Sequence, residues 1–253
     1  MNVVRRYFLS IFTAFFLFSS SAFGDKTLVF PNDPWPPFML GEEGEEATAG
    51  IGVDLMRAIF SRVDGATITI PLVPWKRALN SVKSGAMDGI PLLYKTAERE
   101  SYMDFSDPLF PSQDLVWYSK NHFPNGLEWK TADDFSPYRM GIVSGYSYSE
   151  EIDKAIIDKK FAVTKVKNTH QLFTLLAGGR VDVAIANRVV GTSLIKKDVN
   201  NRHIIPMKKP IAEDDYYMAF SKKTSAKAFL SQVNKAIAEL KAEGEIERIV
   251  YGD

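Results

Sequence analysis

Apolar positions along the chain follow two different spacings, and the alternation between them predicts alternating strands and helices. Short runs of apolar and β-branched residues predict strands at 26–30, 67–72, 87–92, 114–120, 138–145, 161–166, 181–186 and 215–223. Apolar residues at helical spacing predict helices at 52–63, 74–85, 96–103, 147–160, 168–179, 187–197 and 225–244, before a short terminal helix. Alternating strand–helix units imply an α/β fold with largely parallel sheets covered by helices.

Residues that favour helix ends support several of these boundaries. Pro74 suits a first helical position, and Gly85 suits a helix end. Thr96 is a candidate N-cap, and the spacing of Ser147 and Glu150 fits a capping box. The strand at 181–186 runs into Asn187, at the carboxyl edge where open α/β sheets bind ligands, so that edge is a candidate binding site.

The first 24 residues have the pattern of a signal peptide. Arg5 and Arg6 precede an apolar run at 7–18, and small residues follow it, so we expect cleavage after Gly24. The run is too short for a stable membrane span, and an uncleaved anchor is the alternative. The paired arginines leave open whether export follows the general secretory or the twin-arginine route.

Composition narrows the classes of function. The 253 residues include 31 basic and 31 acidic ones, a balance that gives no reason to expect nucleic acid or an anionic membrane surface as a partner. The chain contains no cysteine, so it can form neither a disulfide nor a lipid-modified N-terminal cysteine. Its stability must come from packed core, which this length can bury in one large domain or two smaller ones.

Signatures of catalysis and of metal binding are weak. His122, His170 and His203 lack paired metal-ligand spacing, and there is no G-x-S-x-G nucleophile elbow. The GIG run at 50–52 lacks the third glycine and the preceding strand of a dinucleotide site. We therefore expect no catalytic residue, no metal and no cofactor.

The region 75–110 carries motifs that resemble family 3 of the bacterial solute-binding proteins, the periplasmic receptors of polar amino-acid importers. The motifs are Trp75 opening a helix, KSG at 83–85 with Asp88, TAER at 96–99 and FSDP at 105–108. Supporting matches are WPPF at 35–38, GIGVDLMRAI at 50–59, GIVSGYSYSE at 141–150 and GGRVDVAIAN at 178–187. The resemblance covers nearly all of the chain after the signal peptide, in the family's order.

The resemblance implies a two-lobed periplasmic-binding-protein fold of type II, with the ligand in a cleft at a two-segment hinge. The first lobe would be discontinuous, at 25–111 and 216–253, and the second would span 112–215. We place the crossings near Pro111 and near 214–216.

The resemblance also implies which residues hold the ligand. Arg99 corresponds to the family arginine that pairs with the ligand's carboxylate, which a planar guanidinium suits. The alternative is a surface arginine in a short charged helix. Ser147 corresponds to a threonine that supports the same carboxylate; the alternative is a plain N-cap, and both roles are compatible.

Aromatic residues are the next candidates. Trp35 corresponds to the family's platform over the ligand side chain, and Trp75 falls where another cleft-facing residue lies. Core packing is the alternative, and it is a stronger rival for Trp75. Tyr94 and Tyr146 are further candidates. Two indoles would suit flat apolar or cationic groups.

One position departs from the family. The aspartate that pairs with the ligand's α-ammonium is replaced by Asn187, which offers an acceptor without a charge. A standard α-amino acid should then be held less tightly, because charge-assisted hydrogen bonds are about twice as strong as neutral ones. Arg188 beside it is interpreted as a solvated residue of the first helical turn.

The resulting hypothesis is a periplasmic receptor without enzymatic activity, which binds a small carboxylate-bearing solute and delivers it to the inner-membrane permease of an ABC importer. We expect a monomer with no nucleic-acid partner. One alternative is a periplasmic dehydratase acting on prephenate or arogenate, for which Glu98, Glu213 and Asp215 are candidate general acids by position alone. The other is a stand-alone binding protein that serves a signalling partner.

Overall fold

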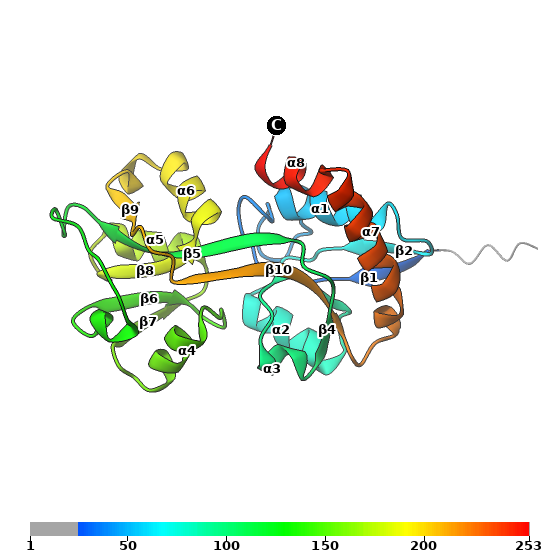
Figure 1. The fold of residues 1–253 in the computed structure, drawn as a ribbon, viewed down its shortest axis with the longest axis horizontal. Coiled ribbons are helices and arrows are strands. Elements are labelled where there is room, and N and C mark those ends of the chain that lie inside the picture. The colour runs from blue at the N-terminus through cyan, green and yellow to red at the C-terminus, as the bar shows by residue number, and fades with distance from the viewer. Residues whose placement is uncertain (1–24, 253) are drawn as a thin grey trace, which may run out of the picture.

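The computed structural model describes residues 25–252, and the predicted signal peptide lies outside them. The chain forms two α/β lobes connected by two long strands, β5 (Phe110–Ser119) and β10 (Ala212–Ser221) (Figure 1). The two-lobed fold expected from the sequence is confirmed.

The first lobe is built from both ends of the described chain. Its N-terminal elements are β1 (Lys26–Val29), α1 (Ile51–Phe60), β2 (Ala66–Thr69), α2 (Trp75–Ser84), β3 (Gly89–Leu93), α3 (Ala97–Glu100) and β4 (Met103–Phe105). Its C-terminal elements are η3 (Ser225–Phe229), α7 (Leu230–Ala242) and α8 (Glu245–Tyr251).

The second lobe contains the elements between the two crossing strands. They are η1 (Ala132–Phe135), β6 (Arg139–Val143), α4 (Glu150–Ile157), β7 (Ala162–Val166), α5 (Thr169–Ala177), β8 (Val183–Asn187), α6 (Arg188–Lys197), η2 (Val199–Asn201) and β9 (Ile204–Pro206). The helices α5 and α6 lie on one side of its strands and α4 on the other (Figure 1).

One mixed sheet passes through both lobes. Its strand order is β3-β10-β5-β8-β6-β7, with β4 paired to β10 and β9 to β5, while β1 and β2 pair separately. The pairs β1–β2, β6–β7 and β6–β8 are parallel, but every pairing of β5 or β10 is antiparallel. The expectation of largely parallel sheets was therefore wrong, because the two crossing strands run against each other and against their neighbours.

The pairing of β5 with β10 fixes the geometry of the crossing. Pro111 lies opposite Asp215, and Ser112 lies opposite Asp214. Beyond this segment β10 pairs with β3 and β4 in the first lobe, and β5 pairs with β8 and β9 in the second. Each lobe thus shares a strand with the other, and the sheet itself forms the connection.

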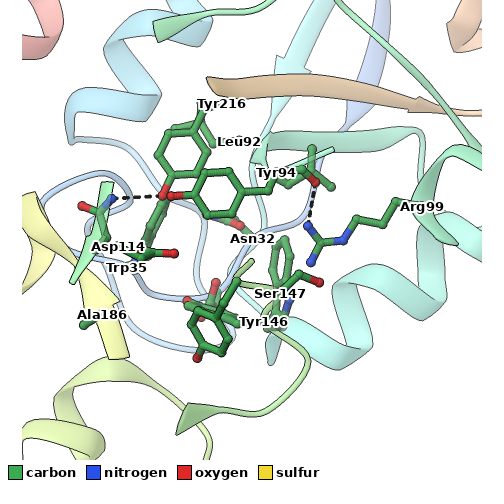
Figure 2. Close-up of a pocket in the computed structure, with 15 residues that line it drawn as sticks. Asn32, Trp35, Leu92, Tyr94, Arg99, Asp114, Tyr146, Ser147, Ala186 and Tyr216 are labelled. Carbon is green, nitrogen blue, oxygen red and sulfur yellow. Dashed lines mark hydrogen bonds between the residues drawn. The ribbon is translucent and has the colours of Figure 1, made fainter. Parts of the chain in front are cut away.

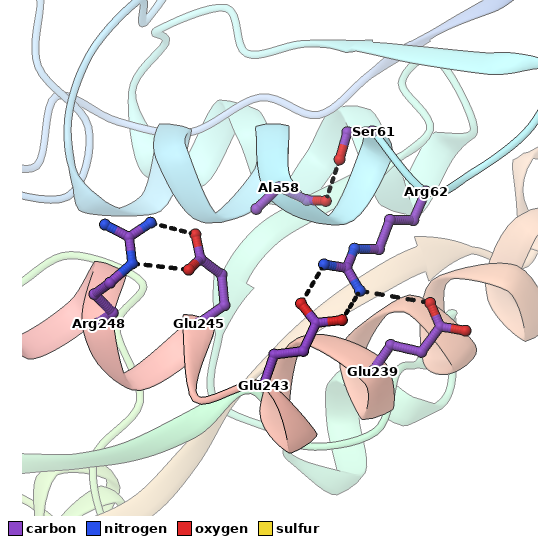
Figure 3. Close-up of polar contacts among 7 residues, drawn as sticks. All are labelled: Ala58, Ser61, Arg62, Glu239, Glu243, Glu245 and Arg248. Atoms are coloured by element: carbon purple, nitrogen blue, oxygen red, sulfur yellow. Dashed lines mark hydrogen bonds and ion pairs between the residues drawn. The ribbon is translucent and has the colours of Figure 1, made fainter.

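The C-terminal helices are fastened to the first lobe. The buried side chains of α7 and α8 (Val233, Ala236, Ile237, Leu240, Ile246 and Val250) share one apolar core with the buried face of α1. At the end of α1, Arg62 donates two hydrogen bonds to Glu243, at 2.8 and 2.6 Å, and lies 3.6 Å from Glu239 (Figure 3). This packing joins the last residues of the described chain to its first ones.

Most predicted helix ends agree with the structure, and two do not. Pro74 was expected at a first helical position, but it is the N-cap of α2, which begins at Trp75. Thr96 accepts a hydrogen bond from the backbone N–H of Arg99 and caps α3, and Gly85 ends α2 with φ 84°. The predicted capping box at Ser147 was wrong. The N-cap of α4 is Ser149, which accepts from the N–H of Ile152. Ser147 therefore lies in the loop before the helix.

Candidate functional site

A cavity lies between the two lobes beside the crossing strands, with about 470 Å³ of empty space that includes the solvent at its open mouth. The first lobe contributes Asn32, Asp33, Trp35, Trp75, Leu92, Leu93, Tyr94 and Arg99, and the second contributes Tyr146, Ser147, Tyr148, Ala186 and Asn187. The crossing strands add Asp114 and Tyr216 (Figure 2).

The residues singled out from the sequence lie together around this cavity. Trp35, Trp75, Tyr94, Arg99, Tyr146, Ser147 and Asn187 all line it. They come from five separate segments of the chain, so the fold gathers them at one place.

Arg99 is a buried cation without an acidic partner. It is 5% exposed, and the structure shows no ion pair within 4.0 Å between it and any described carboxylate. Its Nη1 donates to the carbonyl oxygen of Tyr94 at 2.7 Å, and its Nη2 donates to that of Gly145 at 3.5 Å. Burial lowers the pKa of Arg99, but an arginine remains charged at neutral pH. The guanidinium is thus held in place and keeps its charge available to an anion.

The loop that follows β6 reaches across from the second lobe to the first. The carbonyl oxygen of Gly145 accepts a hydrogen bond from Trp75 Nε1 at 2.9 Å. Tyr146 packs edge-on against Trp75 with ring centres 5.7 Å apart, and its hydroxyl donates to Asp33 at 2.9 Å. Gly145 has φ 88°, and an added Cβ would stand 3.2 Å from Trp75, so glycine suits this close approach. These contacts hold the two lobes against each other.

Ser147 is half-buried beside these contacts. Its hydroxyl makes no hydrogen bond with any residue of the described chain, and it lines the same cavity as Arg99. A hydroxyl next to an unpaired guanidinium can add a donor for an oxyanion.

Aromatic rings form much of the cavity wall. Trp35 stacks on Phe38 with ring centres 4.6 Å apart and packs edge-on against Tyr216 at 5.6 Å. Tyr94 and Tyr216 stack at 4.8 Å with almost parallel planes. The hydroxyl of Tyr94 donates to Ser112 at 3.0 Å. Such a wall can cover a flat apolar or cationic group.

The amide of Asn187 is occupied by the protein itself. Its oxygen accepts from the N–H groups of Val189 and Val190, so Asn187 is the N-cap of α6. Its nitrogen donates to Ser112 at 2.7 Å and to Tyr216 at 3.2 Å. The interpretation of Asn187 as an uncharged acceptor for an ammonium group does not fit this geometry, because no acceptor lone pair of the amide is directed to the cavity.

Two buried carboxyl groups at the cavity were missed by sequence reasoning. Asp33 is 3% exposed in the loop after β1, and Asp114 is 5% exposed on β5. Burial raises the pKa of each to about 7, against the lowering effect of the Tyr146 hydroxyl on Asp33 and of the Tyr94 hydroxyl on Asp114. For Asp114 a signal was present, since an acidic residue opens an otherwise apolar strand.

The general acids suggested for a dehydratase do not reach the cavity. Glu98 and Glu213 are exposed, and Asp215 does not line the cavity either. Within residues 25–252 no cluster of three or more histidine or acidic side chains is arranged to hold a metal ion. No helix in that range is both long and apolar enough to cross a bilayer.

Comparison with known protein families gives one match. The model of the bacterial extracellular solute-binding proteins, family 3, matches residues 28–251.

Individual relatives agree with this match. The probable amino-acid-binding protein YxeM of Bacillus subtilis is 23% identical over 84% of this chain and 78% of its own. The ABC transporter arginine-binding protein 1 of Escherichia coli is 22% identical over 97% of both chains. Among solved structures, an ancestral arginine-binding protein bound to arginine superposes with a TM-score of 0.71 at 25% identity, over 88% of this chain and 96% of that one.

Proposed function

This chain belongs to the bacterial extracellular solute-binding proteins of family 3, and from that premise we propose that it captures a small carboxylate-bearing solute, an amino acid or a close relative, between its lobes. The observation that carries the proposal is Arg99, a buried guanidinium at the cavity with no acidic partner within 4.0 Å among residues 25–252. A buried charge without a partner is costly, and a carboxylate can accept two of its hydrogen bonds at once.

Each of the seven residues singled out from the sequence has a role in this proposal. Arg99 pairs with the carboxylate, and the free hydroxyl of Ser147 adds a donor beside it. Trp35, Tyr94 and Tyr146 enclose the rest of the solute, and Trp75 holds the loop around Gly145 against the first lobe. Asn187 supports the cavity wall and caps α6, without a direct contact to the solute.

Lobe closure is the proposed mechanism of capture. We assign 25–111 and 216–253 to the first lobe and 112–215 to the second, so that both crossings lie where β5 pairs with β10. A solute that binds both lobes stabilises the closed arrangement over the open one. The closed protein, a monomer in the periplasm after cleavage at Gly24, then delivers the solute to the permease of an ABC importer. Relatives described as amino-acid-binding and ABC transporter proteins support this role.

Native mass spectrometry of protein isolated from the periplasm tests the proposal, because a retained solute would be detected by its mass. The same protein is then screened for thermal stabilisation with amino acids, organic acids and amines, since a ligand that binds only the folded state raises its apparent stability. Arg99→Ala should abolish the stabilisation, whereas Arg77→Ala, an exposed position on α2, should retain it. A full screen without any shift, together with no effect of Arg99→Ala, would contradict the proposal.

A second candidate function is favoured by the two buried carboxyl groups. A carboxyl group with a pKa near 7 in an aromatic cavity is suited to general-acid catalysis, and dehydration of a ring acid requires one. Incubation with prephenate, followed by the absorbance of phenylpyruvate, decides between the two functions. Turnover that Asp114→Asn or Asp33→Asn abolishes would establish the enzyme.

A further inference from the structure

Three ionisable groups around the cavity lack partners of opposite charge. Besides Arg99, the carboxyl groups of Asp33 and Asp114 make no ion pair within 4.0 Å with a basic side chain of residues 25–252. All three are at least 95% buried. The cavity therefore contains one site for an anion and two for cations.

The groups beside Asp114 are polar but uncharged, and the nearest charge that acts on it is the carboxylate of Asp153 on α4. The hydroxyls of Ser112, Tyr94 and Tyr216 and the amide of Asn187 bond to one another at 2.7 to 3.2 Å. The stacked rings of Tyr94 and Tyr216 lie beside this network. A cation entering here would meet a carboxylate and aromatic rings, a combination that stabilises ammonium and guanidinium groups.

The two carboxyl groups differ in their relation to Arg99. Figure 2 shows Arg99 and Asp114 on opposite sides of the cavity residues, with Tyr94 and Tyr146 between them. Asp33 belongs to the first lobe, as Arg99 does, and its carboxyl group accepts a hydrogen bond from Tyr146 at 2.9 Å. Because Asp114 lies across the cavity from Arg99, Asp33 is the carboxyl group that we assign to an α-ammonium group.

We propose that the solute is an amino acid with a cationic side chain, whose α-ammonium is held by Asp33 and whose side-chain cation is held by Asp114 across the cavity from Arg99. This inference rests on the proposed function, since it assumes that Arg99 holds the carboxylate. It makes Asp114 the residue that determines specificity for the side chain.

Other side chains fit this arrangement less well. A neutral side chain would leave the Asp114 carboxyl group buried without a charged partner and favour its protonated form, and an acidic side chain would add a like charge beside it. Two effects therefore favour a positively charged side chain. One is its attraction to the Asp114 carboxylate, and the other is that a side chain without positive charge leaves Asp114 unpaired.

Isothermal titration calorimetry of the whole protein with matched solutes tests the inference. Arginine and citrulline share shape and α-groups but differ in side-chain charge, and so do lysine and norleucine. Wild type should bind each cationic member at least about tenfold more tightly than its neutral counterpart, because charge-assisted hydrogen bonds are the stronger kind. Asp114→Asn should remove that preference, and Asp64→Asn, an exposed position of the first lobe, should leave it intact.

The outcomes separate this inference from the proposed function. If citrulline and norleucine bind wild type as tightly as arginine and lysine, or if none of the four binds, the cationic side chain is refuted. The proposed function stands as long as any carboxylate-bearing solute binds in a manner that Arg99→Ala abolishes. Since the wild-type comparison needs no variant, poor folding of Asp114→Asn cannot obscure the result.

Discussion

Asp114 and Asn187 stand directly opposite each other in the antiparallel pairing of β5 and β8, and both side chains are buried at the cavity. Directly opposed residues of an antiparallel pair project to the same face of the sheet, with Cβ atoms about 5 Å apart. The resemblance places a family aspartate at position 187. In this chain the carboxyl group instead stands on the neighbouring strand, and the amide is the cap of α6.

Asn187→Asp should destabilise the protein and should not improve binding of amino acids. Aspartate still caps α6, but its second oxygen would face Asp114, and two carboxylates at this distance disfavour each other's ionisation. We expect a loss of about 1–3 kcal/mol in unfolding free energy above pH 7, and less at pH 5, where a carboxyl group is protonated. Urea unfolding at both pH values measures this.

Asn168→Asp is the matched control. Asn168 is also a helix N-cap, accepting from Gln171 at 2.9 Å at the start of α5, but it is only half-buried and does not line the cavity. An added negative charge at that helix start should be neutral or slightly stabilising. Tighter binding of a neutral amino acid by Asn187→Asp would show that position 187 does face the ammonium group.

Affinity for a cationic amino acid should rise with pH and level off above pH 7. Burial raises the pKa of Asp33 and of Asp114 to about 7, so both carry protons at pH 6 that a bound cation must displace. Each displaced proton weakens binding by about tenfold per pH unit below that value. Calorimetry at pH 5.5 to 8.5, in buffers of different ionisation enthalpy, should detect proton release below pH 7.

The other ionisable groups near Asp33 and Asp114 do not account for this pH dependence of the affinity. Tyr94, Tyr148 and Tyr216 surround Asp114 and Tyr146 contacts Asp33, but burial raises the pKa of every one of these tyrosines above its ordinary value. Asp153 acts on Asp114 from α4, and its own raised pKa reflects burial. A binding constant independent of pH across this range would contradict the role of the two carboxyl groups.

The stability of the unliganded protein should change with pH in the direction opposite to the binding affinity. An aspartate in an unfolded chain has a pKa of about 3.9, so between roughly pH 4 and 7 the folded state binds more protons than the unfolded one. The stability of the unliganded protein should therefore fall as pH rises through that window and then become constant. Unfolding at a series of pH values, with Asp33→Asn/Asp114→Asn as the comparison, tests the sign.

Trp75→Phe should weaken ligand binding with little effect on the unfolding of the free protein. The change removes the hydrogen bond from Nε1 to the carbonyl of Gly145, which joins the two lobes. A net loss of about 1 kcal/mol corresponds to about fivefold in affinity. Trp129→Phe removes the comparable bond to Lys209 within the second lobe and should lower stability without weakening binding. Equal affinity losses in both variants would refute the specific role of Trp75.

Tyr146→Phe should shift the pH dependence of binding upward. The hydroxyl of Tyr146 lowers the pKa of Asp33, and without it only burial remains to set that value. The midpoint of the affinity profile should therefore move above pH 7. Tyr138→Phe, whose ring packs on Phe123 in the second lobe, provides the control with an unchanged midpoint.

Much of the fold could be predicted because local patterns and the family motifs agree. Thr96 and Gly85 delimit their helices as expected, since each interaction involves only neighbouring residues. Ser147 and Ser149 both offer hydroxyls near the start of α4, and their spacing alone could not decide which caps the helix. The antiparallel pairings of β5 and β10 escaped prediction because they join segments about a hundred residues apart.

The residues of the candidate site likewise fall into two groups, those that the sequence could predict and those that it could not. Arg99 and Trp35 lie in motifs that the sequence displays directly. Asp114 does not, because its burial depends on which strand lies opposite it, and that is set by tertiary pairing. The two uses of the Asn187 amide likewise depend on Ser112 and Tyr216, which only the crossing of the strands brings close.

The single strand β10 changes partners at Tyr216, pairing with β5 up to that residue and with β3 and β4 beyond it, with an irregularity between Tyr217 and Ala219. The ring of Tyr216 is also part of the cavity wall. In the proposed function, a solute in contact with this ring would act where β10 passes from one lobe to the other, so its shape would bear directly on the angle between the lobes.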